Sequence, residues 1–168
     1  MTELNKNMLS PVGFNFQIKK TPDMNFFIQS VTLPGVTLGS FEIPNPLKSV
    51  PMYGDHITYG ELEVVFKINE DMTNYLEIFN WITALGFPDD FKQFKSIKSK
   101  TISSGDGIFS DATLSILSSA MNPTTQIFIQ DLFPISLSPV TVDTRDTSID
   151  HVEATASFRF QNYTFTSL

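Results

Sequence analysis

The sequence contains no cysteine. This absence excludes disulfides, thiolate metal sites and cysteine nucleophiles, so stability must come from packing or from assembly. Charged residues are also scarce, at 17% of the chain, which is below the usual quarter for soluble proteins. Uncharged polar residues must therefore cover much of the surface, and such a surface suits contacts between subunits.

Long hydrophobic runs are missing as well, because none approaches the roughly 18 residues that cross a bilayer as a helix. The first residues, MTELNKNMLSP, lack the charged-then-apolar layout of a secretory signal. We therefore expect a product that stays in the cytoplasm of the cell that makes it. The 168 residues fit one domain that can bury a proper core.

Basic residues are outnumbered, with 11 Lys and Arg against 18 Asp and Glu and a formal net charge of -7. The chain as a whole therefore lacks the excess of basic residues that binds nucleic-acid phosphates. Four lysines do gather in one polar stretch, which is typical of a solvated loop: Lys92, Lys95, Lys98 and Lys100.

Catalytic and ligand-binding patterns are also lacking. Neither a GxGxxG nor a GxxxxGK[ST] phosphate cradle occurs. The two histidines, His56 and His151, have no nucleophile or metal-ligand spacing around them, although His56 follows Asp55. The acidic pair Glu70-Asp71 is typical of a helix start, and the pair Asp89-Asp90 is typical of a solvated loop. The run Gly105-Asp106-Gly107 lacks the spaced oxygen ligands of a calcium loop. We expect no enzyme activity, no metal, no cofactor and no small-molecule substrate.

Alternating apolar and polar residues predict several strands in the first half. Residues 14–18 and 25–31 predict an opening hairpin around a turn at Thr21-Pro22-Asp23. Residues 40–55 contain Pro44, Pro46 and Pro51, whose missing N–H groups forbid a central strand, so an extended arm or long loop is expected. A strong strand signal follows over residues 57–68.

One helix is expected over residues 72–85, because apolar residues recur there at three-and-four spacing after an acidic start. Gly86 is well placed as a left-handed residue past its end, and Pro88 prevents it from resuming. Trp81 flanks the expected buried stripe. The predicted core comprises Phe66, Ile78, Phe79, Trp81, Ile82, Phe128 and Phe158.

Further strands are expected over residues 111–118, 125–132 and 149–165, with the second ending at Phe133-Pro134 and the third slipping near Gln161-Asn162. The fold class is therefore mainly β: an antiparallel β-sandwich or open barrel with one packed α-helix. Residues 1–168 form a single domain with a short leader over 1–12, the arm over about 40–55, and a long loop over about 87–110 that we expect to contact a neighbour.

Several short elements occur in an order that resembles the tail tube proteins of contractile-tailed bacteriophages, a family similar in fold to the tube protein of type VI secretion systems. They are Leu33-Pro34-Gly35, Gly54-Asp55, the strand-to-helix junction at 61–71, Phe79-Asn80-Trp81-Ile82 and Leu132-Phe133-Pro134. The resemblance covers most of residues 13–165.

The resemblance implies that six copies close into a ring with a continuous β-barrel as its inner wall. Rings would stack into a tube inside a sheath and above a baseplate, and DNA would cross it without tight binding. The location implied is a virion tail assembled in the host cytoplasm. Expected contacts between subunits, chosen because they are apolar and lie on the arm or near the ends, are Met8, Leu9, Phe41, Ile43, Leu47, Val50, Met52, Tyr53 and Phe165.

Two alternatives stay open. The short polar leader and the lysine-bearing loop depart from the family pattern, so the chain fits a tube-initiating baseplate subunit or a tube terminator as well as a tube subunit. A second class is a monomeric β-sandwich that binds carbohydrate or a receptor at its loops, with Tyr53, Phe87 and Phe91 as its aromatic candidates.

Overall fold

The computed structural model describes residues 8–9, 11–86, 92, 95, 107–143, 145 and 151–167. The remainder of the 87–110 loop and most of the 1–12 leader, with Phe87, Pro88, Asp89, Asp90 and Phe91, lie outside the described residues. The elements follow in the order β1 (Phe14–Ile18), α1 (Pro22–Asn25), β2 (Ile28–Thr32), β3 (Val36–Ile43), β4 (Val50–Tyr59), β5 (Leu62–Lys67), α2 (Thr73–Gly86), β6 (Ser110–Leu117), β7 (Pro123–Leu137), β8 (Glu153–Arg159) and β9 (Asn162–Ser167).

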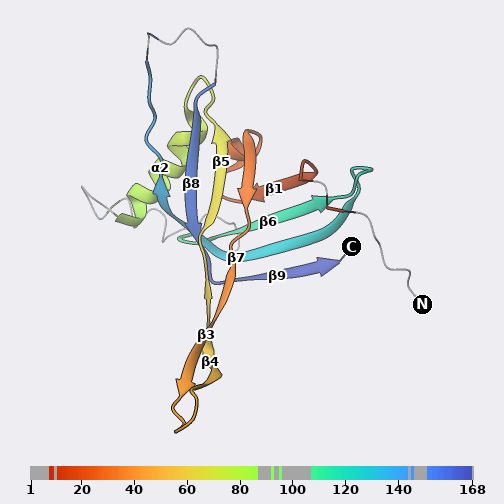
Figure 1. Ribbon diagram of the computed structural model, residues 1–168. Helices are drawn as coiled ribbons and strands as arrows, with labels where there is room; N and C mark the ends of the chain where they lie inside the picture. Colours follow the sequence, from red (N-terminus) through yellow and green to blue (C-terminus); the bar gives the residue numbers. More distant parts are fainter. Residues whose placement is uncertain are drawn as a thin grey trace.

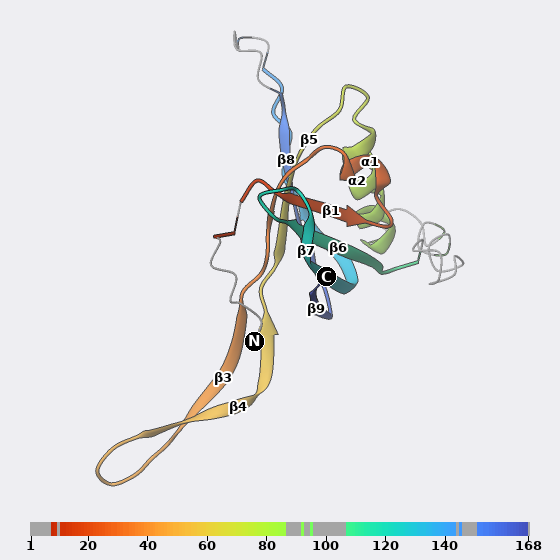
Figure 2. The same ribbon diagram turned by 90° about the vertical axis from the view of Figure 1, so that its right-hand side faces the viewer.

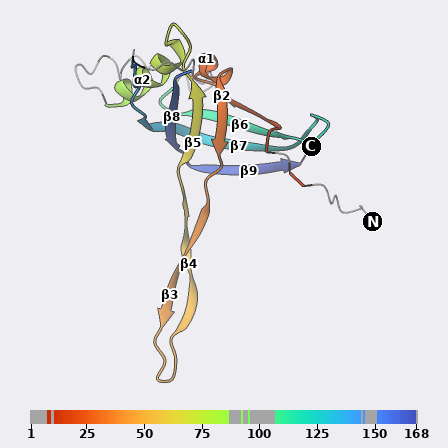
Figure 3. The same cartoon turned by 45° about the horizontal axis from the view of Figure 1, so that its top comes forward.

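The expected mainly β, antiparallel fold with one packed helix is confirmed. One group of strands, here called sheet A, has the order β1-β6-β7-β9. A second group, called sheet B, consists of β2, β5, β8 and the second half of β7. Every pairing is antiparallel. The two sheets run crosswise and are joined through the long strand β7 (Figures 1 and 3). Figure 1 also shows α2 lying beside sheet B.

The corner between the sheets is a β-bulge in β7. Ser110 pairs with Leu132, but two residues further along β6, Ala112 pairs with Ile129, so β7 carries one extra residue there. Asp131 adopts a left-handed φ of 54° at this point. The expected strand end at Phe133-Pro134 is therefore wrong, because β7 turns the corner and continues to Leu137. Pro134 is tolerated since only β8 pairs with β7 there, on one side.

The predicted opening hairpin is also wrong. β1 pairs with β6 in sheet A, and β2 pairs with β5 in sheet B, so the two strands are edges of different sheets. The short helix α1 lies between them, and the Asn25 side chain bonds both the backbone N–H and the carbonyl of Ile18, at 2.9 and 3.0 Å. Alternation predicted the strands but not their partners, because pairing depends on the tertiary fold.

The core fills the space between the sheets and α2. Phe66, Ile78, Trp81 and Phe158 are all at most 2% exposed. The Trp81 indole N–H donates to the carbonyl of Ile108 at 3.1 Å, and its ring packs against Phe158. Ile82 is partly buried against the same cluster.

Two expected core residues lie elsewhere. The buried stripe of α2 is Asn74, Ile78, Trp81 and Ala84, which leaves Phe79 49% exposed, because two residues rotate a helix by about 200° from Trp81. Phe128 is half-buried on the polar face of sheet A, since its neighbours Ile127 and Ile129 take the core side of β7.

Helix α2 matches the predicted 72–85 closely, but its ends differ in detail. Glu70 and Asp71 precede the helix, and Met72 before it has a φ of 55°. The junction is held by buried Asn74, whose amide donates to the Lys67 carbonyl at 2.7 Å and whose oxygen accepts the Tyr75 N–H at 2.9 Å. Gly86 is the last residue of the helix and is not left-handed, so the expected glycine cap is wrong.

Candidate assembly surfaces

Residues 36–59 form a two-stranded ribbon that projects from the body (Figure 2). The expected single strand over 57–68 breaks at Gly60-Glu61. The segment expected as an extended arm or long loop at 40–55 is mostly paired, with Glu42 opposite Pro51. Proline fits because each strand of a two-stranded ribbon is an edge. The ribbon extends strands β2 and β5 of sheet B out of the body, with β3 following β2 and β4 preceding β5.

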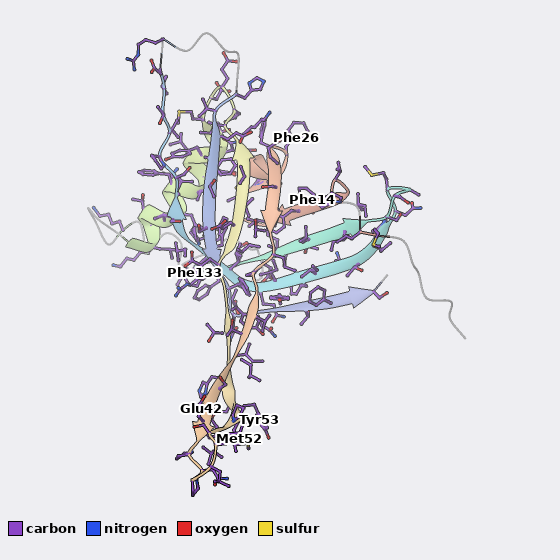
Figure 4. All side chains as sticks on the ribbon, viewed as in Figure 1. Phe14, Phe26, Glu42, Met52, Tyr53 and Phe133 are labelled. Atoms are coloured by element: carbon purple, nitrogen blue, oxygen red, sulfur yellow. The ribbon has the colours of Figure 1, made fainter. Side chains whose placement is uncertain are left out.

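The ribbon exposes apolar side chains along its whole length. Leu47 at the tip is 97% exposed and Tyr53 is 76% exposed, and Figure 4 shows Met52, Tyr53 and Glu42 at the end far from the body. All ribbon residues expected as contacts are exposed, and the structure adds three that the sequence analysis did not name. The exposed apolar residues are Val36, Leu38, Phe41, Ile43, Leu47, Val50, Met52, Tyr53 and Ile57.

Cross-strand pairing sorts these side chains into two apolar patches. Near the body, Leu38 lies opposite Ile57, and towards the tip Phe41 lies opposite Met52. Residues directly opposite share one face, whereas Leu38 and Phe41 are an odd number of residues apart and so point to opposite faces of β3. The ribbon therefore offers an apolar patch on each side, separated by a kink at Gly39.

The kink depends on glycine. Between Leu38 and Ser40 the register shifts, so that β4 carries extra residues opposite Gly39. A Cβ added to Gly54 would lie 2.8 Å from the Gly39 carbonyl oxygen, closer than such atoms approach, whereas one added to Gly39 would lie 3.6 Å from its nearest neighbour. The backbones touch here because Gly54 has no side chain.

The root of the ribbon is fixed by three aromatic rings. Tyr59 at the end of β4 lies 5.5 Å from Phe160 and 5.4 Å from Tyr163 between ring centroids. The Tyr59 hydroxyl also donates to the Asn162 side chain at 3.0 Å. The ribbon therefore leaves the body from a defined point where sheets A and B meet.

The sheets have unpaired edges within the described residues. Sheet A ends in β1 and β9, and sheet B ends in β2 and the second half of β7. An apolar groove of about 300 Å³ lies between the β1 and β2 edges, lined in part by Leu9, Pro11 and Val31. Met8, Leu9 and Phe165, the expected contacts near the chain ends, are all exposed, as is Phe26, which the sequence analysis did not name.

Among the described residues, the candidates His56 and His151 form no catalytic constellation. His56 contacts the Asp55 carboxylate, but both side chains are almost fully exposed on β4 of the ribbon. His151 lies in an exposed segment before β8. In the described part of the chain no three His, Asp or Glu side chains are grouped to hold a metal ion. Likewise, no helix there is long and apolar enough to cross a membrane.

Glu77 on α2 is a partly buried carboxyl whose pKa is raised above its ordinary value. Desolvation raises its pKa, and the nearby Asp23 charge raises it further. Its carboxylate accepts the Met24 N–H at 3.4 Å, which ties α2 to α1.

Sequence comparison finds no matching protein family and no curated relative. Comparison with solved structures finds chains of the same fold. One, in the sheath–tube complex of an extracellular contractile injection system (PVC) in its extended state, is 16% identical, with a TM-score of 0.67 over 98% of this chain and 95% of that chain. Another, from the sheath/tube terminator of that system in its extended state, is 15% identical, with a TM-score of 0.67 over 98% and 100%.

A third similar chain comes from the six-fold symmetrised baseplate of the anti-feeding prophage. It is 13% identical, with a TM-score of 0.65 over 98% of each chain. All three span nearly the full length of this protein, including the ribbon and both sheets. The expected likeness to tail tube proteins is thereby confirmed at the level of the fold: this chain has the fold found in the tube, terminator and baseplate assemblies of contractile injection systems.

Proposed function

We propose that this chain is the structural subunit of a phage-type tail tube. Copies close into hexameric rings, the rings stack, and the resulting tube is the conduit through which DNA is ejected. The chain catalyses no reaction and binds no cofactor in this role. Its partners are further copies of itself, a surrounding sheath and a baseplate, in a virion tail assembled in the host cytoplasm.

The observation that carries the proposal is the β3–β4 ribbon. It exposes apolar side chains on both faces, yet an isolated two-stranded ribbon is marginally stable in water, so the arrangement makes sense when other copies cover it. Strands at the edges of both sheets point to the same need. The fold likeness to chains within tube complexes supports this choice of partner.

We propose that the ribbon residues expected as contacts bind at different places in the assembly. Leu47 at the tip, with Phe41, Ile43, Val50 and Met52 on one patch, packs on a copy in the neighbouring ring. Tyr53 lies on the other face of the ribbon, opposite Ser40. Met8, Leu9 and Phe165 add contacts near the chain ends.

The test replaces Leu47 and Met52 with aspartate in one variant. Burying two carboxylates in an apolar contact costs several kcal/mol per ring contact, so negative-stain microscopy should show single rings or small particles where the wild type forms tubes. The matched control, Leu47→Met with Met52→Leu, keeps the apolar volume and should form tubes. Both residues are exposed in the subunit, so the melting temperature of dissociated subunits should not change.

Tubes of normal length from the aspartate variant would refute the ribbon contact. Wild-type protein that stays as isolated small particles at high concentration would instead favour the monomeric binding module.

A second candidate role has its own support, because the terminator complex matches this chain as well as the sheath–tube complex does. In either role, as a terminator or as a tube-initiating baseplate subunit, we expect the chain to form one ring that does not stack with itself. Rings without tubes from purified wild-type protein would favour this role over the repeating tube subunit.

A further inference from the structure

The two sheets carry different chemistry on the faces turned away from the core. On sheet A, one row across the four strands consists of Asn15, Ser115, Gln126 and Thr166. The next row consists of Gln17, Thr113, Phe128 and Thr164. Each of these side chains is half-buried or exposed, and none carries a charge.

Charge is almost absent from the strands of sheet A. Only two charged residues occur in them, Asp111 and Asp131, and both lie at the corner where β7 turns into sheet B. The Asp111 carboxylate is paired with the Lys19 ammonium at 3.0 Å. The wall formed by the middle of sheet A is therefore neutral.

Sheet B shows that this neutrality is not simply a property of the chain. Its outward face includes Lys67 directly opposite Glu153, and Arg159 lies 3.4 Å from Glu61. Both sheets cover the same core, and a charged outer face would serve solubility equally well on either. The absence of charge from sheet A therefore needs a reason specific to that face.

We infer that the polar face of sheet A is the lumen wall of the assembled tube, and that it handles DNA by being neutral, neither attracting nor repelling its phosphates. This inference rests on the proposed function, because it needs a ring. β1 and β9 are the two edges of sheet A, so joining them between copies would continue this one sheet around the ring and place its polar face on one side.

The physical reason lies in repetition. Any charge on the wall would recur in each copy of every ring, within a Debye length of about 8 Å of passing phosphates in a narrow bore. A basic side chain would hold DNA through many salt-sensitive contacts. An acidic one would oppose its passage along the whole tube. Hydroxyl and amide groups avoid both effects because they keep a hydrated surface without net charge.

Because the chain has no cysteine, a single introduced thiol can be labelled without background. Ser115→Cys tubes would be treated with a small maleimide and with a maleimide attached to a protein too large for the bore. A lumen position should react with the small reagent only, while dissociated subunits react with both. Reaction of the tubes with both reagents would place the face outside, and reaction with neither would place it in an interface. Either result would overturn the inference.

Neutrality itself is tested with Thr113→Lys, using Thr113→Gln as the neutral control and Thr155→Lys on sheet B as the positional control. Thr113→Lys tubes should retain short duplex DNA in a nuclease-resistant form. Raising the salt from about 50 to 200 mM should lower that retention about tenfold for as few as two phosphate contacts. Wild-type, Thr113→Gln and Thr155→Lys tubes should retain none.

Salt-sensitive, nuclease-resistant DNA in wild-type tubes would overturn the neutral-wall inference while leaving the tube intact. Absence of tubes from wild-type protein in the microscope would overturn the proposed function, and the inference with it. The two failures are therefore distinguished by microscopy before any labelling.

Discussion

At the scale of single residues, Trp81 links helix α2 to the rest of the core. Its side chain is 2% exposed, contacts Phe158, and donates to the Ile108 carbonyl. Trp81→Ala should lower the free energy of unfolding by about 3 to 5 kcal/mol, because it leaves a large cavity and an unpaired carbonyl. Urea unfolding of dissociated subunits measures this loss.

Phe79→Ala is the matched control for that substitution. It removes an aromatic ring from the same helix two residues away, but Phe79 is half-exposed, so its loss should be much smaller. Equal losses for the two variants would show that the aromatic rings contribute through helix propensity or the unfolded state instead of core packing.

Glu77 gives stability a specific dependence on pH. Its pKa in the folded state is raised by desolvation and by Asp23, so the folded protein binds its proton more tightly than the unfolded chain does. Stability from this group is therefore present at low pH and is lost as pH rises through the folded pKa. At neutral pH the ionised carboxylate weakens the fold.

Glu77→Gln should therefore raise the melting temperature at pH 7, and the gain should shrink below about pH 4, where the carboxyl is protonated in both states. Melting curves of wild type and variant across this pH range provide the measurement. Asp23→Asn should produce a smaller gain of the same sign. A Glu77→Gln gain that is constant across pH would mean that the carboxylate charge is not its cause.

At the scale of elements, the sequence predicted which segments are regular better than it predicted their partners. Helix α2 was found because its periodic apolar residues are local, and β6 was found because alternation is local too. The partner of β1 was missed, since nothing near Phe14 or Phe16 encodes pairing with a strand about 100 residues later. The bulge at Asp131 was missed for the same reason, as its left-handed backbone serves a corner that exists only in three dimensions.

The ribbon was anticipated in part. Its three prolines correctly excluded a central strand, and the apolar residues between them indicated an exposed surface in need of cover. Its pairing and its kink were not anticipated. Pro44 and Pro46 suggested an unpaired arm or a loop, and the significance of Gly54 appears only when its backbone meets Gly39.

The kink can be tested with two alanines. Gly54→Ala places a Cβ against the Gly39 backbone and should distort the ribbon, reducing the yield of tubes in the microscope. Gly39→Ala, whose Cβ has ordinary contacts, should assemble normally. The melting temperature of dissociated subunits should stay near wild type for both, because the ribbon lies outside the core. Equal tube yields would show that the kink is not needed for stacking.

At the scale of the whole molecule, the open edges of sheet A limit how the proposed ring can close. The Asn25 side chain satisfies the outward backbone groups of Ile18, and by alternation the outward groups of Phe14 and Phe16 remain for a partner strand. β9 offers the other edge, with Asn162, Thr164 and Thr166 on the polar face that also carries Asn15. In the proposed ring we therefore expect β1 of one copy to pair with β9 of the next.

Paired strands bring facing Cβ atoms to about 4.5 to 5.5 Å, within reach of a disulfide after small adjustments. Asn15→Cys is combined in turn with Asn162→Cys, Thr164→Cys and Thr166→Cys, which gives three double variants. We expect one of them to form disulfides between subunits when the assembled protein is mildly oxidised. On a denaturing gel this variant should show a ladder of linked subunits that ends at the hexamer. Thr32→Cys on the β2 edge with Thr164→Cys is the control and should give no ladder. A ladder from the control pair, or none from any register in protein that forms rings, would mean that the ring closes through different strands, because a β1–β9 junction must bring one of these three pairs together.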